Sequence, residues 1–213
     1  MVDFLFDGPE DARVTLLLAH GAGAAMDSGT MNAATAALAA EGIRVVRFEF
    51  AYMASRRTPA GPKPPPKAEK VMPEFLAAVA ALGPVAGPLL IGGKSMGGRV
   101  ASMVADGLHA RGEIAGLVCL GYPFHPPGKP EQLRTAHLIG MTTPALIVQG
   151  TRDPFGTSDE VPGYGLSDQI EVLWMEDGDH DLKPRKAISG FTAAQHLKTM
   201  AQAVAAFAAR IAP

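Results

Sequence analysis

The sequence contains a single cysteine, Cys119, among its 213 residues. It cannot form a disulfide within the chain, so nothing in the sequence requires an oxidising compartment. No apolar run approaches the roughly 18 residues that a membrane span needs. The start of the chain, Met1–Phe4, is acidic and lacks a basic region followed by an apolar core, so no signal peptide is predicted. We therefore expect a cytoplasmic protein that does not act in a membrane.

An excess of charge of either sign is also missing. Nineteen lysines and arginines face 21 aspartates and glutamates, for a formal net charge of −2. This balance argues against a nucleic-acid partner. A composition that is 47% hydrophobic and 19% charged excludes a disordered chain. The length suffices for a sizeable core, and we expect residues 1–213 to form one domain.

Short apolar segments alternate with helical patterns along the whole chain. Strands are predicted at Phe4–Phe6, Val14–Ala19, Ile43–Phe50, Pro88–Ile91, Ile114–Leu120, Pro144–Gln149 and Ile170–Met175, and helices at Thr30–Ala40, Ala68–Leu82, Ser95–Leu108 and Ser189–Ala209. The last helix has apolar residues at helical spacing from Phe191 to Ile211. Such alternation predicts an α/β fold, with a mostly parallel sheet of about six to seven strands covered by helices on both faces.

The most informative stretch is Gly93-Lys94-Ser95-Met96-Gly97. In a chain with 24 glycines this five-residue pattern is weak evidence by itself. However, an apolar strand precedes it and a helical pattern follows at once, which is the context of the G-x-S-x-G nucleophile elbow. Such a turn would hold Ser95 above the carboxyl edge of the sheet and aim the N-terminus of the next helix at the reaction centre.

A nucleophilic serine needs a histidine base, and in folds with this elbow the base follows the serine and the acid along the chain. His180 satisfies this order, in a polar loop after the last predicted strand. A solvated loop histidine is the ordinary alternative, but order and position favour the base. His196 lies on a surface-like stretch of the closing helix. The others fit the order or position less well; they are His20, His109, His125 and His137.

Asp153 is the best candidate for the acid that orients the base. It follows the Pro144–Gln149 strand by one turn, where a triad acid belongs. The alternative, an ordinary turn aspartate before Pro154, stays open. The remaining acids between Ser95 and His180 lie on a helix, follow no strand, or are too close to His180; they are Asp106, Asp159, Asp168, Asp177 and Asp179.

The developing oxyanion needs preorganised donors. We expect the backbone N–H groups of Met96, after the nucleophile, and of Ala22, in the loop after the Val14–Ala19 strand, to supply them. Glycines around Ala22 allow its backbone to face inward. His20 is interpreted as structural in that turn.

With Leu17–Gly23, Gly93–Arg99, Gly150–Pro154 and Gly178–His180 in place, the chain resembles an α/β-hydrolase over nearly its whole length. The resemblance implies a minimal hydrolase without a large cap domain. The chain is also similar, more distantly, to dienelactone hydrolases, which have a cysteine where this chain has Ser95.

A narrower resemblance is to the compact family that includes testis-expressed protein 30, a subunit of a histone acetyltransferase complex and many bacterial relatives. It depends on Arg56–Pro59 with Pro64–Lys67, and on Gly121–Pro130. The chromatin-associated relative implies a possible role as an interaction module.

Two segments that follow strands are expected to overhang the active-site mouth. Their polar and basic side chains are Arg56, Arg57, Lys63 and Lys67 in one, and Tyr122, His125 and Lys129 in the other, while Lys94 adjoins the nucleophile. Together they predict a cationic rim that attracts an anionic substrate. A proline-stiffened surface loop with solvated charges remains the alternative.

These observations predict a serine hydrolase that acts on a small ester or thioester through an acyl-enzyme, with neither a metal nor an organic cofactor. Two alternatives remain open. One is a non-catalytic interaction or scaffold protein on the same fold. The other is a serine peptidase or acyltransferase, because the same triad performs those reactions.

Overall fold

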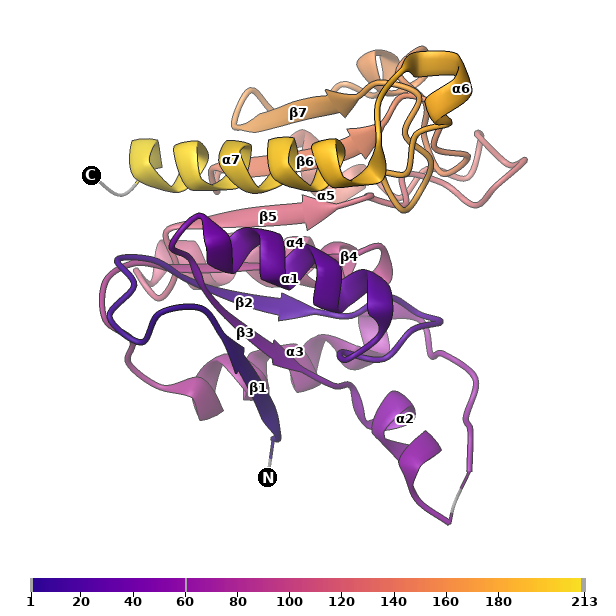
Figure 1. Ribbon diagram of the computed structural model, residues 1–213. Coiled ribbons are helices and arrows are strands. Elements are labelled where there is room, and N and C mark those ends of the chain that lie inside the picture. The colour runs from indigo at the N-terminus through magenta and orange to yellow at the C-terminus, as the bar shows by residue number, and fades with distance from the viewer. Residues whose placement is uncertain (1, 60, 212–213) are drawn as a thin grey trace.

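The computed structural model describes residues 2–59 and 61–211. In this part of the chain seven strands form one sheet, in the order β1-β3-β2-β4-β5-β6-β7 (Figure 1). All neighbouring strands are parallel except β1, which runs antiparallel to β3. The strands are β1 (Phe4–Asp7), β2 (Thr15–Ala19), β3 (Arg44–Phe48), β4 (Leu89–Lys94), β5 (Gly116–Leu120), β6 (Ala145–Gly150) and β7 (Ile170–Met175).

Helices cover both faces of the sheet. One apolar core lies between the sheet and α3 and α4, and a second lies between the opposite face and α1 and α7, which run side by side in Figure 1. The helices are α1 (Gly29–Ala40), α2 (Ala51–Ala54), α3 (Ala68–Leu82), α4 (Met96–Ala110), α5 (Ala136–Ile139), α6 (Lys186–Ser189) and α7 (Ala193–Ile211), with 3-10 turns at Ser55–Arg57 and Val161–Tyr164.

The predicted fold class is confirmed. Strands β2, β4, β5 and β6 are buried along their whole length, which explains why they read as unbroken apolar runs rather than alternating ones. Their carboxyl ends meet at one edge of the sheet, the place where such sheets bind ligands. None of the helices in the described ranges combines the length and apolar character that crossing a bilayer requires.

The predicted closing helix begins later than expected, at Ala193, and a separate short helix, α6, precedes it. Gly190 adopts the left-handed conformation (φ 80°) and ends α6. A capping box then starts α7, because the Thr192 N–H donates to the Gln195 side chain and the Gln195 N–H donates to Thr192 Oγ1. Phe191 lies between the two helices with 37% of its surface exposed, so the prediction that it begins a helical apolar face is wrong.

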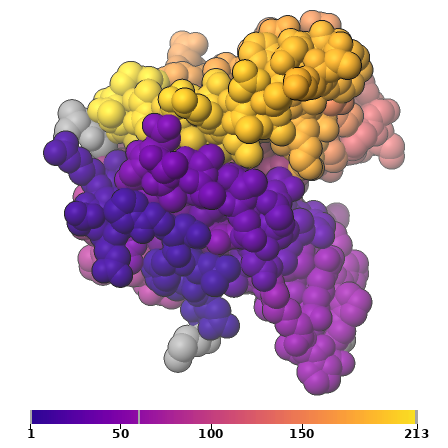
Figure 2. All heavy atoms as spheres, viewed as in Figure 1, coloured from indigo at the N-terminus to yellow at the C-terminus, as the bar shows by residue number. Residues whose placement is uncertain are grey.

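The segment between β3 and α3 projects from the body of the molecule (Figure 2). It contains the proline-stiffened surface loop that the sequence offered as the alternative to a cationic rim. The structure adds α2 and the 3-10 turn Ser55–Arg57 at its start. Ala60, in the same segment, lies outside the described residues.

Candidate active site

Ser95 lies at the turn between β4 and α4, in a backbone conformation that non-glycine residues rarely adopt (φ 52°, ψ −118°). The turn is tight enough to require glycine on both sides. A Cβ atom on Gly93 would lie 2.3 Å from the Gly97 carbonyl carbon, and one on Gly97 would lie 2.5 Å from the His20 carbonyl oxygen. The sequence therefore supplies the only residue type that allows this close approach, and the serine side chain stands clear of the strand.

Ser95, His180 and Asp153 form one continuous hydrogen-bonded chain. The Ser95 hydroxyl lies 2.8 Å from His180 Nε2, and His180 Nδ1 lies 2.8 Å from Asp153 Oδ2. Because the Asp153 carboxylate accepts from Nδ1–H, Nε2 is left free to accept the serine proton. The structure thus brings together the three side chains that the sequence predicted, from the ends of β4, β6 and β7.

Buried polar groups hold the Asp153 carboxylate, which is itself fully buried. Gln149 Nε2 donates to Oδ2 at 2.9 Å, and the Phe155 N–H donates to Oδ1 at 2.9 Å. Gln149 is fixed in turn by the backbone of Tyr122. The Phe155 ring packs on the His180 imidazole, with centroids 4.2 Å apart. Sequence reasoning missed Gln149, although it is the one polar side chain in an otherwise apolar strand.

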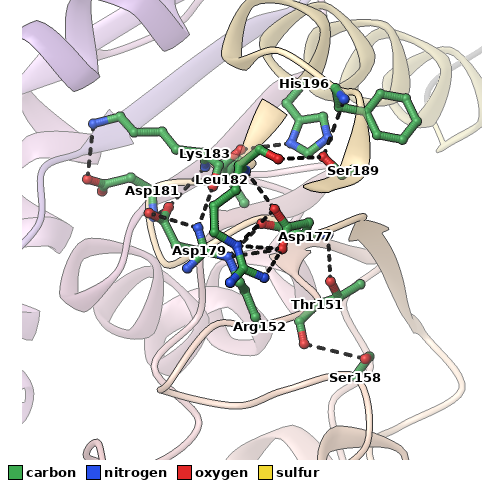
Figure 3. A network of polar contacts seen from close by, with 12 residues as sticks. Thr151, Arg152, Ser158, Asp177, Asp179, Asp181, Leu182, Lys183, Ser189 and His196 are labelled. Carbon is green, nitrogen blue, oxygen red and sulfur yellow. Dashed lines mark hydrogen bonds and ion pairs between the residues drawn. The ribbon is translucent and has the colours of Figure 1, made fainter. Parts of the chain in front are cut away.

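A polar network behind the His180 loop fixes the loop's shape (Figure 3). Arg152 Nε donates to the Asp177 carbonyl at 2.7 Å, and Asp179 Oδ1 accepts two backbone N–H groups further along the loop, each at 2.9 Å. His196 Nδ1 donates to the Leu182 carbonyl at 2.8 Å. His196 is only 4% exposed, so its interpretation as a surface residue is wrong. It anchors the loop to α7.

Lys94 fastens the same loop from the side of the sheet. Its Nζ donates to the His180 carbonyl at 2.7 Å and lies 3.5 Å from Asp181 Oδ1. Burial lowers the pKa of this amine, while the carboxylates of Asp181 and Asp153 oppose the shift. Lys94 does not belong to an exposed rim, which corrects the prediction that it contacts substrate. Its position makes it a positioning residue for His180.

Replacing Lys94 by methionine should lower kcat about ten- to fiftyfold, the size expected when a charge-assisted hydrogen bond is lost. KM should stay within about twofold, because the side chain lines no part of the pocket. Stability should fall by about 1–3 kcal/mol, because the His180 carbonyl loses its donor. Steady-state kinetics on a chromogenic ester and urea unfolding test this, with Lys129→Met at an exposed site as the control. Unchanged kcat in Lys94→Met would contradict the role.

The loop after β2 is organised around His20. This imidazole is fully buried; its Nε2 accepts the Phe50 N–H at 3.1 Å, so Nδ1 carries the proton and donates to the Gly21 carbonyl at 2.7 Å. The Tyr52 hydroxyl reaches the same carbonyl at 3.3 Å. Burial lowers the pKa of His20, consistent with a neutral ring. The interpretation of His20 as structural agrees with these contacts.

This arrangement orients the Ala22 N–H. In a trans peptide the N–H points opposite to the preceding carbonyl. The Ala22 N–H is therefore directed away from His20 and Tyr52, and Ala22 lines the pocket at Ser95. Met96 is the first residue of α4, where backbone N–H groups lack partners within the helix. Both predicted oxyanion donors thus lie beside the serine.

A family model described as an alpha/beta hydrolase domain matches residues 12–209. The chain belongs to the α/β-hydrolase family. Solved structures share its fold at low identity. XC6422 from Xanthomonas campestris, described as an α/β serine hydrolase without lid, is 21% identical with a TM-score of 0.71 over 100% of this chain and 90% of that one. The dienelactone hydrolase from Anabaena variabilis is 16% identical, TM-score 0.71, over 100% and 93%.

A third similar structure is Est1E from Butyrivibrio proteoclasticus with bound ferulic acid. It is 17% identical, with a TM-score of 0.68 over 99% of this chain and 95% of that one. At these identities the likeness concerns the fold alone. Within the described ranges, no group of three or more His, Cys, Asp or Glu side chains is placed to hold a metal ion.

A pocket of about 480 Å³ opens at Ser95. Its walls combine apolar and charged residues. The apolar or small lining residues are Ala22, Pro65, Pro66, Ala68, Met96, Pro123 and Phe155, and the charged ones are Lys67, Glu69, Arg99 and Arg134.

Most of the side chains predicted to contact substrate lie elsewhere. Tyr122 is fully buried and His125 is 2% exposed, because the chain after β5 folds them inward rather than over the mouth. Arg57 is engaged by Asp27 at 2.7 Å and Glu49 at 2.9 Å. Arg56 donates to the Gly23 carbonyl and does not line the pocket. Of the predicted rim, Lys67 lines the pocket, whereas Arg56, Arg57, Tyr122 and His125 do not.

The charged groups that do line the pocket were only partly accessible to sequence reasoning. Arg99 follows Ser95 by four residues on a helix, a spacing that places both on one face. That signal was available. Arg134 lies in an irregular segment whose path no pattern predicts.

Proposed function

We propose that this chain is a serine hydrolase that cleaves an ester or thioester through an acyl-enzyme formed on Ser95. The observation that supports it most directly is the unbroken chain of hydrogen bonds from the Ser95 hydroxyl through His180 to Asp153. The strained elbow, the two free backbone donors and the adjoining pocket supply what such a reaction needs beyond the triad.

The reaction follows from these positions. Ser95 Oγ attacks the acyl carbon while its proton passes to His180 Nε2, and Asp153 stabilises the resulting imidazolium. The N–H groups of Met96 and Ala22 bind the oxyanion. The bond to the leaving alcohol or thiol then breaks, and the leaving group takes the proton from His180. A water molecule, deprotonated by His180, attacks the acyl-enzyme and releases the acid and free Ser95.

The substrate class is proposed to be a small-molecule ester or thioester, reached without a large cap domain. The narrower resemblance to the testis-expressed protein 30 family and the description of XC6422 as lacking a lid are consistent with this. The projecting segment with α2 is the feature that favours the alternative of an interaction protein, since it offers a docking surface. The two proposals differ in whether Ser95 is reactive.

Labelling with a fluorophosphonate probe, read by intact mass, tests the proposal. Wild-type protein should gain one adduct, and Ser95→Ala should gain none, because only an activated serine attacks the phosphorus. Ser102→Ala is a matched control, since Ser102 also contacts a histidine, His137, at 2.8 Å but is buried on α4. It should label like wild type. A folded wild-type protein without an adduct would remove the hydrolase proposal in favour of the interaction protein.

A further inference from the structure

One guanidinium in the pocket has no direct ion-pair partner among the described residues. Arg134 lines the same pocket as Ser95, and no acceptor within residues 2–59 and 61–211 hydrogen-bonds to its side chain. Its backbone is held at both polar groups: its N–H donates to the Phe124 carbonyl at 2.7 Å, and its carbonyl accepts the Tyr122 hydroxyl at 3.2 Å. The backbone at Arg134 is therefore fixed, while its guanidinium remains available to a ligand.

Arg99 adds a second cation, one turn along α4 from the nucleophile. Its NH2 group donates to Glu69 Oε1 at 2.6 Å, but its Nε–H is buried without an acceptor. Glu69 therefore satisfies only one end of this guanidinium. That contact also shows that a carboxylate can bind in this corner of the pocket.

The two arginines repel each other. Burial, followed by the charge of Arg99, lowers the pKa of Arg134. Lys67 lines the same pocket, so three cationic groups face the single carboxylate of Glu69. Binding an anion would relieve this repulsion, and a planar guanidinium matches a carboxylate with two parallel hydrogen bonds.

The rest of the pocket lining is largely apolar and includes Pro65, Pro66, Pro123, Met96 and Phe155. A short hydrocarbon chain would fit such walls, with a reactive ester at one end and an anion at the other.

We propose that the pocket selects esters that carry a carboxylate, with Arg134 as the main contact of that group and Arg99 beside it. This inference rests on the proposed function and names its substrate class. It replaces the predicted rim of Arg56 and Arg57 with residues inside the pocket.

The test compares 4-nitrophenyl adipate monoester, which has a free carboxylate on its acyl chain, with neutral 4-nitrophenyl hexanoate. Arg134→Gln should lower the ratio of kcat/KM for the anionic ester over the neutral one by about ten- to a hundredfold, the size of a hydrogen bond between charged groups. Arg134→Lys should restore part of it. Arg57→Gln, whose charge is engaged outside the pocket, should leave the ratio at its wild-type value. An unchanged ratio in Arg134→Gln, both for this pair and for the leaving-group pair described next, would overturn the inference.

A second pair of substrates locates the carboxylate. The hexanoate esters of 4-hydroxybenzoate and of neutral 4-hydroxyacetophenone carry the difference on the leaving group. If the kcat/KM ratio of the first pair depends on Arg134, the carboxylate belongs to the acyl part of the substrate. If the ratio of the second pair depends on Arg134, the carboxylate belongs to the alcohol part. Dependence in neither pair counts against the site.

A binding measurement separates this inference from the proposed function. Calorimetry on Ser95→Ala should show monomethyl adipate binding at least tenfold more tightly than neutral dimethyl adipate, and Arg134→Gln on the same background should abolish the difference. Probe labelling of wild type without this preference overturns the carboxylate site and leaves the hydrolase. Arg134-dependent binding without labelling or turnover supports the site and overturns the hydrolase.

Discussion

Replacing Asp153 by asparagine should lower kcat about 10⁴-fold, the loss typical of this change in Ser-His-Asp sites. The carboxylate accepts from Gln149 and His180 on one oxygen and from the Phe155 N–H on the other. An amide cannot accept at both positions. If its NH2 group faces His180, Nδ1 must become the acceptor, so Nε2 carries the proton and points it at Ser95. If the amide is reversed, its NH2 group meets the Phe155 N–H.

Either orientation places a donor against a donor in a site without exposure to water, so a loss of stability of about 1–3 kcal/mol should accompany the loss of activity. Steady-state hydrolysis of a chromogenic ester and the rate of fluorophosphonate labelling should fall together. Asp159→Asn is the matched control, because Asp159 is exposed and also lies between Ser95 and His180. Equal activity of the two variants would mean that Asp153 is only a turn residue.

Replacing Gly97 by alanine should destabilise the protein by about 2–4 kcal/mol, somewhat above the usual cost of an overpacked site. The added Cβ would lie 2.5 Å from the His20 oxygen and 2.7 Å from the Ala19 oxygen, and both atoms are backbone. No side chain can rotate away, so the end of β2 must move. That movement displaces the loop with Ala22, and activity should fall as well.

The control lies in the same helix. An alanine at Gly107 would have its nearest neighbour at 3.6 Å, the flexible end of Arg111, so Gly107→Ala should stabilise by up to about 1 kcal/mol through helix propensity alone. Urea unfolding of both variants and their labelling rates check this. Gly97→Ala matching Gly107→Ala in stability and reactivity would show that the contact with β2 can relax.

The arrangement of Ser95, His180 and Asp153 could be predicted because topology determines it. Ser95, Asp153 and His180 each follow a strand of one parallel sheet, and the carboxyl ends of those strands meet at one edge. Chain order and distance from a strand were therefore sufficient. The same reasoning placed both backbone donors, since neither depends on a side-chain conformation.

Side-chain direction is what the sequence did not contain. Tyr122 and His125 follow β5 as predicted, but the chain turns at Gly121 (φ 64°) and folds them into the core. Arg57 is paired with Asp27 and Glu49. Nothing in the sequence pattern marks either carboxylate as its partner. The roles of Lys94 and Gln149 depend on which buried acceptor lies within reach, and that is a property of the packed structure.

The bond from Lys94 to the His180 carbonyl limits how the loop after β7 can change in length. A lysine side chain has a fixed reach, and it starts from a buried strand that cannot shift. Substitutions between Met175 and His180 can preserve the position of that carbonyl. An inserted or deleted residue would move it out of reach of the amine, even where the imidazole could still approach Ser95. Among relatives that keep this lysine, the segment between Met175 and His180 should vary in sequence but keep the same length.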